Sequence, residues 1–218
     1  WENTDPNYMF DLNVPEKLFR DMPDAKNTYF KTHTKYSKLT REIIENNNIK
    51  VIISIRDLRD MMISRYYHIM SLDTHWQHNS ISKLNFKEGF KISLINKKND
   101  HELNPLNYYY FWIKNWVEYV KEKRNILILN YDEYVKNKEN YISKILHYLE
   151  IEKKIFNFEK YNSKKIKKNE LSKSLNNFGR NKSTFRSGKK DQWQSLFDDD
   201  ITKFFFDNLP ENNLEKLK

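Results

Sequence analysis

The chain has 218 residues, of which 38% are hydrophobic, 15% aromatic and 32% charged, so it can bury one sizeable core and is globular. Its net charge of +9 favours an anionic partner such as a nucleotide, a nucleic acid, a membrane surface or an acidic substrate. It has no cysteine, which excludes disulfides and thiolate sites, and no stretch approaches the roughly 20 apolar residues that cross a bilayer.

These properties predict one cytoplasmic domain over residues 1–218. The first residues do not resemble a signal peptide. The chain begins with Trp1 and not with methionine, so we expect its natural start to lie further upstream. Many lysines lie in Lys/Asn-rich stretches such as residues 164–168, which are equally compatible with a solvated surface.

The first half of the chain alternates between strand and helix patterns. Apolar runs at residues 28–31 and 51–55 flank a helical pattern at residues 39–47, which predicts a parallel pair of strands joined by a helix. A second helix is predicted over residues 57–71. The polar segment 74–104 reads as a loop with one covering helix near residues 86–95.

The second half continues the alternation. An aromatic amphipathic helix is predicted over residues 108–123, a buried strand over 125–130 and a helix over 132–149. Beyond residue 150 the pattern is short, basic and helical, and it passes through Gly179 and Gly188, two of only three glycines in the chain. The fold class is therefore α/β, a parallel sheet flanked by helices.

Lys31 and His33 end the first predicted strand. Strand side chains alternate, so the two project from one face and place a cation and a titratable base at the carboxyl edge of the sheet, where open α/β folds bind ligands. Alternatively, a lysine and a histidine merely end a strand at the surface. The short motif alone favours this second interpretation.

Arg56 and Ser64 lie eight residues apart across the corner between the second strand and its helix. Backbone N–H groups at a helix N-terminus favour an anion, and an arginine and a hydroxyl there can complete a phosphate site. The alternative is that Arg56 pairs with Asp57 or Asp60 and that Ser64 lies on a helix flank.

Two further elements fit a nucleotide. Arg186 and Gly188 lie in a basic loop, where a guanidinium fork and exposed amides can bind phosphate. Tyr131 follows the strand 125–130 and can stack on a purine or hydrogen-bond to it. A surface turn and a core tyrosine are the alternatives.

Together these elements resemble the cytosolic-type sulfotransferases that use PAPS (3′-phosphoadenosine 5′-phosphosulfate). The shared order is KTH, an apolar strand ending in arginine with serine eight positions later and YYH after it, a strand ending in Tyr-acidic-acidic, and FRxGxxxxW. The resemblance runs from about residue 15 to residue 197. It implies a P-loop-NTPase-like parallel sheet, PAPS as donor, PAP as product, a small-molecule, lipid or sugar acceptor, and no metal.

The resemblance also implies roles for individual residues. His33 would be the general base that takes a proton from the acceptor hydroxyl or amine, and Lys31 a cation near the sulfuryl group. The nucleotide-binding residues would be Arg56, Ser64, Tyr131, Phe185, Arg186, Ser187 and Gly188, of which Arg56, Ser64 and Arg186 hold the 3′-phosphate. Trp193 would be a packing residue.

The chain departs from the family pattern in three ways. The phosphosulfate loop, a Pro-Lys-Ser-Gly-Thr-like turn after the family's first strand, is absent, so we expect an N-terminally incomplete domain. Ser187 stands where many members have lysine. The C-terminal dimerisation pattern is not found, which leaves the oligomeric state open.

Other functions remain to be weighed against a sulfotransferase. The missing loop is compatible with a sulfotransferase-like module that binds nucleotide without turnover. The positive charge is compatible with nucleic-acid binding, but no nucleic-acid motif is present and the lysines are dispersed. His75 and His78 are the closest histidine pair and lack further ligands for zinc.

Overall fold

The computed structural model describes residues 34, 36–100, 102–121, 123–158, 190–211 and 214. In chain order the elements are α2 (Lys38–Asn46), β1 (Val51–Ile55), α3 (Leu58–Ser71), α4 (His78–Ile81), α5 (Phe86–Ile95), α6 (Pro105–Val120), β2 (Ile126–Asn130), α7 (Tyr131–Lys136), α8 (Lys138–Tyr148), η2 (Lys153–Ile155), α11 (Trp193–Leu196) and α12 (Asp199–Asp207). The predicted strand at residues 28–31 lies outside this part of the chain. None of the described helices is both long and apolar enough to span a membrane.

The sheet of the described residues consists of β1 and β2, which run parallel in the register Val51 to Ile126 and Ile55 to Asn130. Both strands therefore end at the same edge. In β1, Ile53 and Ile55 are buried while Ile52 is exposed, as expected when one face of a strand packs on the core.

Tyr148, at the end of α8, binds the end of the sheet at which both strands begin. Its hydroxyl donates to the Asn125 carbonyl at 2.5 Å and accepts from the Val51 N–H at 3.1 Å. The Val51 N–H also donates to the Asn125 carbonyl at 2.9 Å. These bonds fix the starts of both strands, and with them the register that brings their carboxyl ends together.

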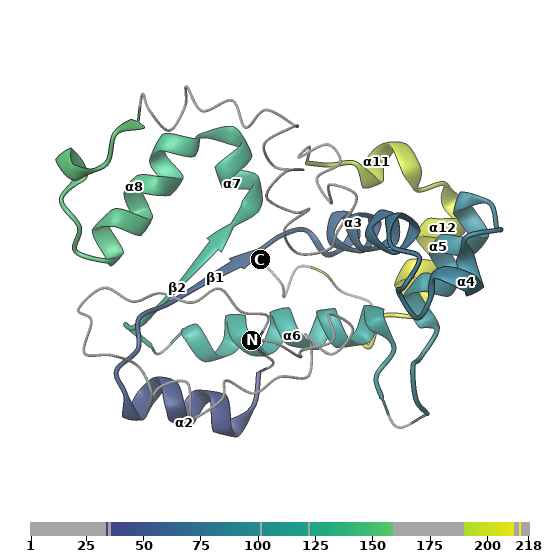
Figure 1. Ribbon diagram of the computed structural model, residues 1–218, viewed down its shortest axis with the longest axis horizontal. Coiled ribbons are helices and arrows are strands. Elements are labelled where there is room, and N and C mark those ends of the chain that lie inside the picture. The colour runs from purple at the N-terminus through teal and green to yellow at the C-terminus, as the bar shows by residue number, and fades with distance from the viewer. Residues whose placement is uncertain are drawn as a thin grey trace.

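Helices lie on both sides of the strands (Figure 1). In this view α6 runs along one side of β1 and β2, and α7 and α8 lie on the other. Helix α6 turns Tyr110, Ile113 and Trp116 into the core, at the i, i+3 spacing of a buried helical face. The arrangement is a helix-rich α/β fold with a small parallel sheet.

Helix α3 is the central element of the remaining core. Ile63 and Ile69 are fully buried, and Tyr66 packs edge-on against Phe86 and Phe90 of α5. A Cβ at Gly89 of α5 would lie 3.3 Å from the Tyr66 ring and from the Ile81 carbonyl oxygen. The glycine therefore permits the close approach of α5 to α3.

Helix α12 packs against α5, on the right of Figure 1. Asp200 accepts from Lys87 at 2.6 Å and from Lys91 at 2.7 Å. These ion pairs are exposed and contribute little, whereas Phe205 of α12 is fully buried and contributes most of the attachment. Because α11 immediately precedes α12, this contact keeps α11 beside α3.

Most elements appear where the sequence predicts them, with three corrections. The segment 74–104, predicted as a loop with one covering helix, contains a second, short helix, α4. Helix α6 begins three residues earlier than predicted because Asn104 caps it, accepting from the Asn107 N–H at 2.8 Å, and Pro105 occupies its first position. The single helix predicted over residues 132–149 is two helices. Asn137 breaks it with φ −150°, ψ 90° and caps α8 by accepting from the Asn140 N–H.

Candidate functional site

The site is built at the edge where β1 and β2 end side by side. The residue after β1 is Arg56 and the residue after β2 is Tyr131. The Arg56 guanidinium carbon lies 4.9 Å from the centroid of the Tyr131 ring, a cation–π distance. Two residues 75 positions apart, both predicted as nucleotide ligands, are therefore in contact.

Asp60 in the first turn of α3 binds Arg56. Arg56 Nη2 donates to Asp60 Oδ2 at 3.0 Å, and the side chains of Arg56 and Asp60 are 16% and 0% exposed. This ion pair was the alternative interpretation of Arg56, and it is present. Sequence reasoning missed the second partner of Asp60: its Oδ1 accepts from the Trp193 backbone N–H at 3.0 Å.

The N-terminus of α3 carries its own carboxylate. Asp57 Oδ1 accepts from the Arg59 backbone N–H and from Arg59 Nε, both at 2.9 Å, and Oδ2 accepts from Arg59 Nη2 at 2.5 Å. Burial alone would raise the pKa of Asp57, but the bonds from Arg59 outweigh it and lower the pKa. Asp57 therefore already accepts one of the backbone N–H groups at this helix start.

Trp193 joins a third segment to this edge. The Arg59 guanidinium carbon lies 3.6 Å from the Trp193 ring centroid, and Phe197 packs edge-on against the ring at 6.3 Å. The prediction that Trp193 is a packing residue is confirmed. Because Trp193 is the last residue of the FRxGxxxxW motif, the end of that motif is bound to Asp60, the ion-pair partner of Arg56.

Acidic groups also face the site. Burial raises the pKa of Asp132, and the carboxylates of Asp191 and Asp60 raise it further. One Asp132 carboxylate oxygen, Oδ1, is buried without a hydrogen-bond partner among the described residues. Asp191 has a left-handed φ of 56°, a conformation that aspartate adopts more readily than most residues, and pairs with Lys190 at 3.0 Å.

Ser64 does not lie at the helix start. It is the seventh residue of α3, which places it about 9 Å along the helix axis from Leu58 at 1.5 Å per residue. Its side chain is exposed. The structure thus brings Arg56, Tyr131 and Trp193 together and leaves Ser64 two turns further along α3.

The other predicted site residues lie outside the described residues: Lys31, His33, Phe185, Arg186, Ser187 and Gly188. The residue after His33 is nevertheless placed. Thr34 is buried, and its carbonyl accepts from Trp112 Nε1 of α6 at 2.9 Å. Within the described part of the chain, no group of three His, Asp or Glu side chains is arranged to hold a metal ion.

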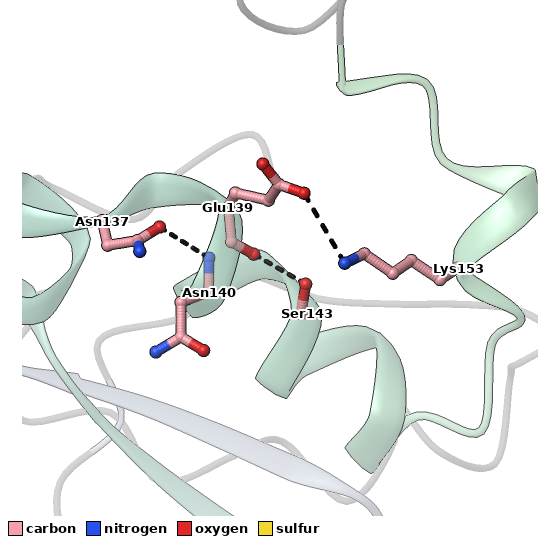
Figure 2. Close-up of a pocket in the computed structure, with 5 residues that line it drawn as sticks. All are labelled: Asn137, Glu139, Asn140, Ser143 and Lys153. Carbon is pink, nitrogen blue, oxygen red and sulfur yellow. Dashed lines mark hydrogen bonds and ion pairs between the residues drawn. The ribbon is translucent and has the colours of Figure 1, made fainter.

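A surface hollow at the start of α8 lies apart from this edge and is lined by Asn137, Glu139, Asn140, Ser143 and Lys153. Figure 2 shows that these residues bond to one another. Asn137 accepts from the Asn140 N–H at 2.9 Å, Ser143 donates to the Glu139 carbonyl at 2.8 Å, and Lys153 pairs with Glu139 at 3.5 Å. The hollow is open and polar, and we assign it no ligand.

Comparisons with solved structures identify the fold. Retinol dehydratase, in complex with androsterone and inactive cofactor PAP, matches with a TM-score of 0.61 and 20% identity over 87% of this chain and 54% of that one. Mouse sulfotransferase SULT7A1, complexed with PAP, matches with a TM-score of 0.55 and 16% identity over 80% of this chain and 62% of that one. This chain thus spans less than two thirds of either protein, and at these identities the likeness shows the fold alone.

No curated protein sequence matches the chain. The family model described as "Sulfotransferase domain" matches residues 7–218, nearly the whole chain. The order of motifs, the parallel strands that end in Arg56 and Tyr131, and the two structural matches agree with it. The chain belongs to the sulfotransferase domain family.

Proposed function

We propose that residues 1–218 form one domain that binds PAPS and its product PAP at the carboxyl edge of β1 and β2. The domain transfers the sulfuryl group of PAPS to a hydroxyl or amine of a small-molecule, lipid or sugar acceptor. The proposal is supported by one observation: three segments that carry the motifs meet at one edge of the sheet. Arg56 contacts the Tyr131 ring and pairs with Asp60, and Asp60 also accepts from the Trp193 backbone N–H.

Charge at this edge bears on how a nucleotide phosphate would bind. The named cations are Arg56, Arg59 and Lys190, and the named carboxylates are Asp57, Asp60, Asp132 and Asp191. Three cations against four carboxylates do not make an anion site by themselves. Much of the attraction for the 3′-phosphate would therefore come from Arg186 and from the backbone of Ser187 and Gly188. Arg56 would donate further hydrogen bonds to the same phosphate through its guanidinium.

Tyr131 is proposed to lie by the adenine. Its ring is already one face of a cation–π pair with Arg56, so base and phosphate would be bound by residues in mutual contact. Phe185, next to Arg186 in the sequence, is proposed to complete the nucleotide site.

His33 and Lys31 are proposed to act at the reactive end. His33 would take the proton of the acceptor hydroxyl or amine as the new bond to sulfur forms, and the bond between sulfur and the bridging oxygen breaks to release PAP. Lys31 would stabilise the charge that develops on that bridging oxygen. The residue that follows His33 in the sequence, Thr34, is buried and bound to Trp112.

The test is PAP binding measured by calorimetry with paired variants. Ser64→Ala is compared with Ser80→Ala, which changes another exposed serine, and Arg186→Ala with Arg180→Ala, an arginine outside the motif. We expect Ser64→Ala to weaken PAP binding about threefold to tenfold and Arg186→Ala by about tenfold or more, as for lost hydrogen bonds to charged groups. Arg56→Ala is less informative, because it would strand the buried Asp60 carboxylate.

Absence of PAP binding by the unmodified chain would overturn the proposal, as would equal losses in each variant and its control. Transfer is then tested with labelled PAPS and a panel of phenols, alcohols and amines. Transfer that His33→Ala abolishes supports the enzyme, whereas PAP binding without transfer to any acceptor supports the binding module instead.

A further inference from the structure

Asp60 connects Arg56, at the end of β1, with Trp193, which lies 133 residues beyond Asp60 in the sequence. Its carboxylate is fully buried, and each oxygen binds a different segment: Oδ2 the Arg56 guanidinium and Oδ1 the Trp193 backbone N–H, both at 3.0 Å. One segment follows β1, and the other is the last residue of the FRxGxxxxW motif, where α11 begins.

The geometry sets Asp60 apart from the neighbouring acid. Asp57 is bound by Arg59, two residues away on the same turn, so its own hydrogen bonds stay within the helix start, and Arg59 in turn lies against the Trp193 ring. The two bonds of Asp60 instead cross between elements, and a carboxylate buried in this way holds its partners in fixed directions. Displacing either partner would leave a buried charge without its hydrogen bond, which costs more than an exposed contact does.

We propose that Asp60 is the positioning residue for recognition of the 3′-phosphate. It would orient the Arg56 guanidinium and would also fix the distance between Arg56 and the chain at Trp193. Both segments could then contact the same phosphate. The proposal rests on the proposed function, since it assigns Asp60 to the nucleotide site described above. Asp60 itself does not touch the nucleotide in this scheme.

Asp60→Asn separates the two bonds of this side chain. The asparagine oxygen can still accept from the Trp193 N–H, but its NH₂ group would face Arg56 Nη2, a donor against a donor. The matched control is Asp57→Asn, which removes one carboxylate charge from the same turn and keeps a good N-cap.

The readout is the ratio of the dissociation constants for AMP and PAP, two nucleotides that differ by the 3′-phosphate. We expect Asp60→Asn to weaken PAP binding about tenfold and to leave AMP binding within about twofold, whereas Asp57→Asn, which removes the same charge, does not weaken PAP binding selectively; tenfold corresponds to about 1.4 kcal/mol. A general loss of structure would weaken both nucleotides alike, so the ratio separates positioning from stability.

Parallel losses for PAP and AMP, or an unchanged ratio, would overturn the role of Asp60 while leaving the proposed function intact. If the unmodified chain fails to bind PAP, it is the proposed function that fails. Should Asp60→Asn not fold, Asp60→Glu keeps the buried charge that Arg56 needs and lengthens the side chain by one methylene. The same selective loss for PAP is then expected, and an unchanged ratio counts against the proposal.

Discussion

Arg56 illustrates how two interpretations of one residue can both describe its contacts. It makes the ion pair with Asp60 that a structural role requires, and it lies over the Tyr131 ring at the sheet edge that a nucleotide site requires. A buried counter-ion reduces the net attraction for phosphate, but it also holds the guanidinium in one orientation before the ligand arrives. The ion pair is thus compatible with the phosphate role.

The surroundings of Asp132 at this edge disfavour its charged form. Burial and the nearby carboxylates Asp191 and Asp60 raise its pKa above the ordinary value of 3.8, and its Oδ1 has no hydrogen-bond partner in the part of the chain that the structure describes. An acid whose pKa rises on folding favours the folded state below its unfolded pKa, and this contribution is lost as the pH rises through the folded pKa.

Asp132→Asn is therefore expected to stabilise the protein near pH 7, by less than about 1 kcal/mol because the side chain is partly exposed, and to have little effect below pH 3.8. Removing a negative charge beside the phosphate site should also tighten PAP binding about twofold to fivefold at low salt. Urea unfolding across this pH range and calorimetry with PAP check both effects.

Asp73→Asn, at an exposed loop position, serves as the control for net charge. If Asp73→Asn tightens PAP binding as much as Asp132→Asn, the effect is a property of the whole charge and not of the site. A loss of stability at neutral pH in Asp132→Asn would contradict the assigned direction of the pKa shift.

At the scale of elements, the sequence predicts best where one local signal decides the structure. The run Val51–Ile55 is short, apolar and β-branched, and the residues around Asn85 and Asp57 carry helix caps, so β1, α3 and α5 lie where they are predicted. Asn137 escapes prediction because asparagine is tolerated within helices and its capping conformation depends on how α7 and α8 pack.

The candidate site is predictable in part for the same reason. Arg56 and Tyr131 follow directly from strand ends, and parallel strands must end at one edge. The bond from the Trp193 backbone N–H to the Asp60 carboxylate joins distant segments, and no pattern of side chains in the sequence predicts it. The four-residue spacing of Arg56 and Asp60 at a helix start was the one available signal.

The junction of α3, α4 and α5 contains a second element-scale feature, a set of cationic and titratable groups around His75. Arg65 of α3 donates to the Ser93 carbonyl at 2.9 Å and to Gln77 Oε1 at 2.5 Å. Burial, followed by the charges of Arg65, His68, His78 and Lys98, lowers the pKa of His75 to about 4. His75 is thus neutral in the folded protein at pH 7, and its Nδ1 accepts from the Gln77 N–H at 3.1 Å.

A histidine with a lowered folded pKa supports the folded state above its unfolded value of 6.5, and this support is lost as the pH falls toward 4. The free energy of unfolding therefore falls between pH 6.5 and 4 in the wild type. We expect His75→Asn to make this fall less steep, by at most the slope that the binding of one proton contributes. An asparagine oxygen can accept the same N–H without titrating. Urea titrations at several pH values measure this. His147→Asn, exposed on α8, is the control, and parallel curves for wild type and His75→Asn would contradict the prediction.

At the scale of the whole molecule, the proposed nucleotide site lies where separate parts of the fold converge. Arg56 begins the path into α3, Tyr131 begins α7, and Trp193 begins α11, which leads into the buried Phe205 of α12. A ligand that contacts these segments together binds only the folded arrangement, because the unfolded chain does not bring them near one another. Its binding free energy should therefore appear as stability of the whole domain.

PAP at about 100 times its dissociation constant should stabilise the fold by about 2.7 kcal/mol, which corresponds to a rise in Tm of about 5–11 °C for a domain of this size. AMP at the same concentration should raise Tm less, because it lacks the 3′-phosphate. The shift with PAP should shrink between 50 mM and 500 mM salt, because Arg186 and Lys31 are proposed to act through charge. Thermal unfolding monitored by circular dichroism checks these outcomes, and equal shifts with PAP and AMP would show that the fold does not recognise the 3′-phosphate.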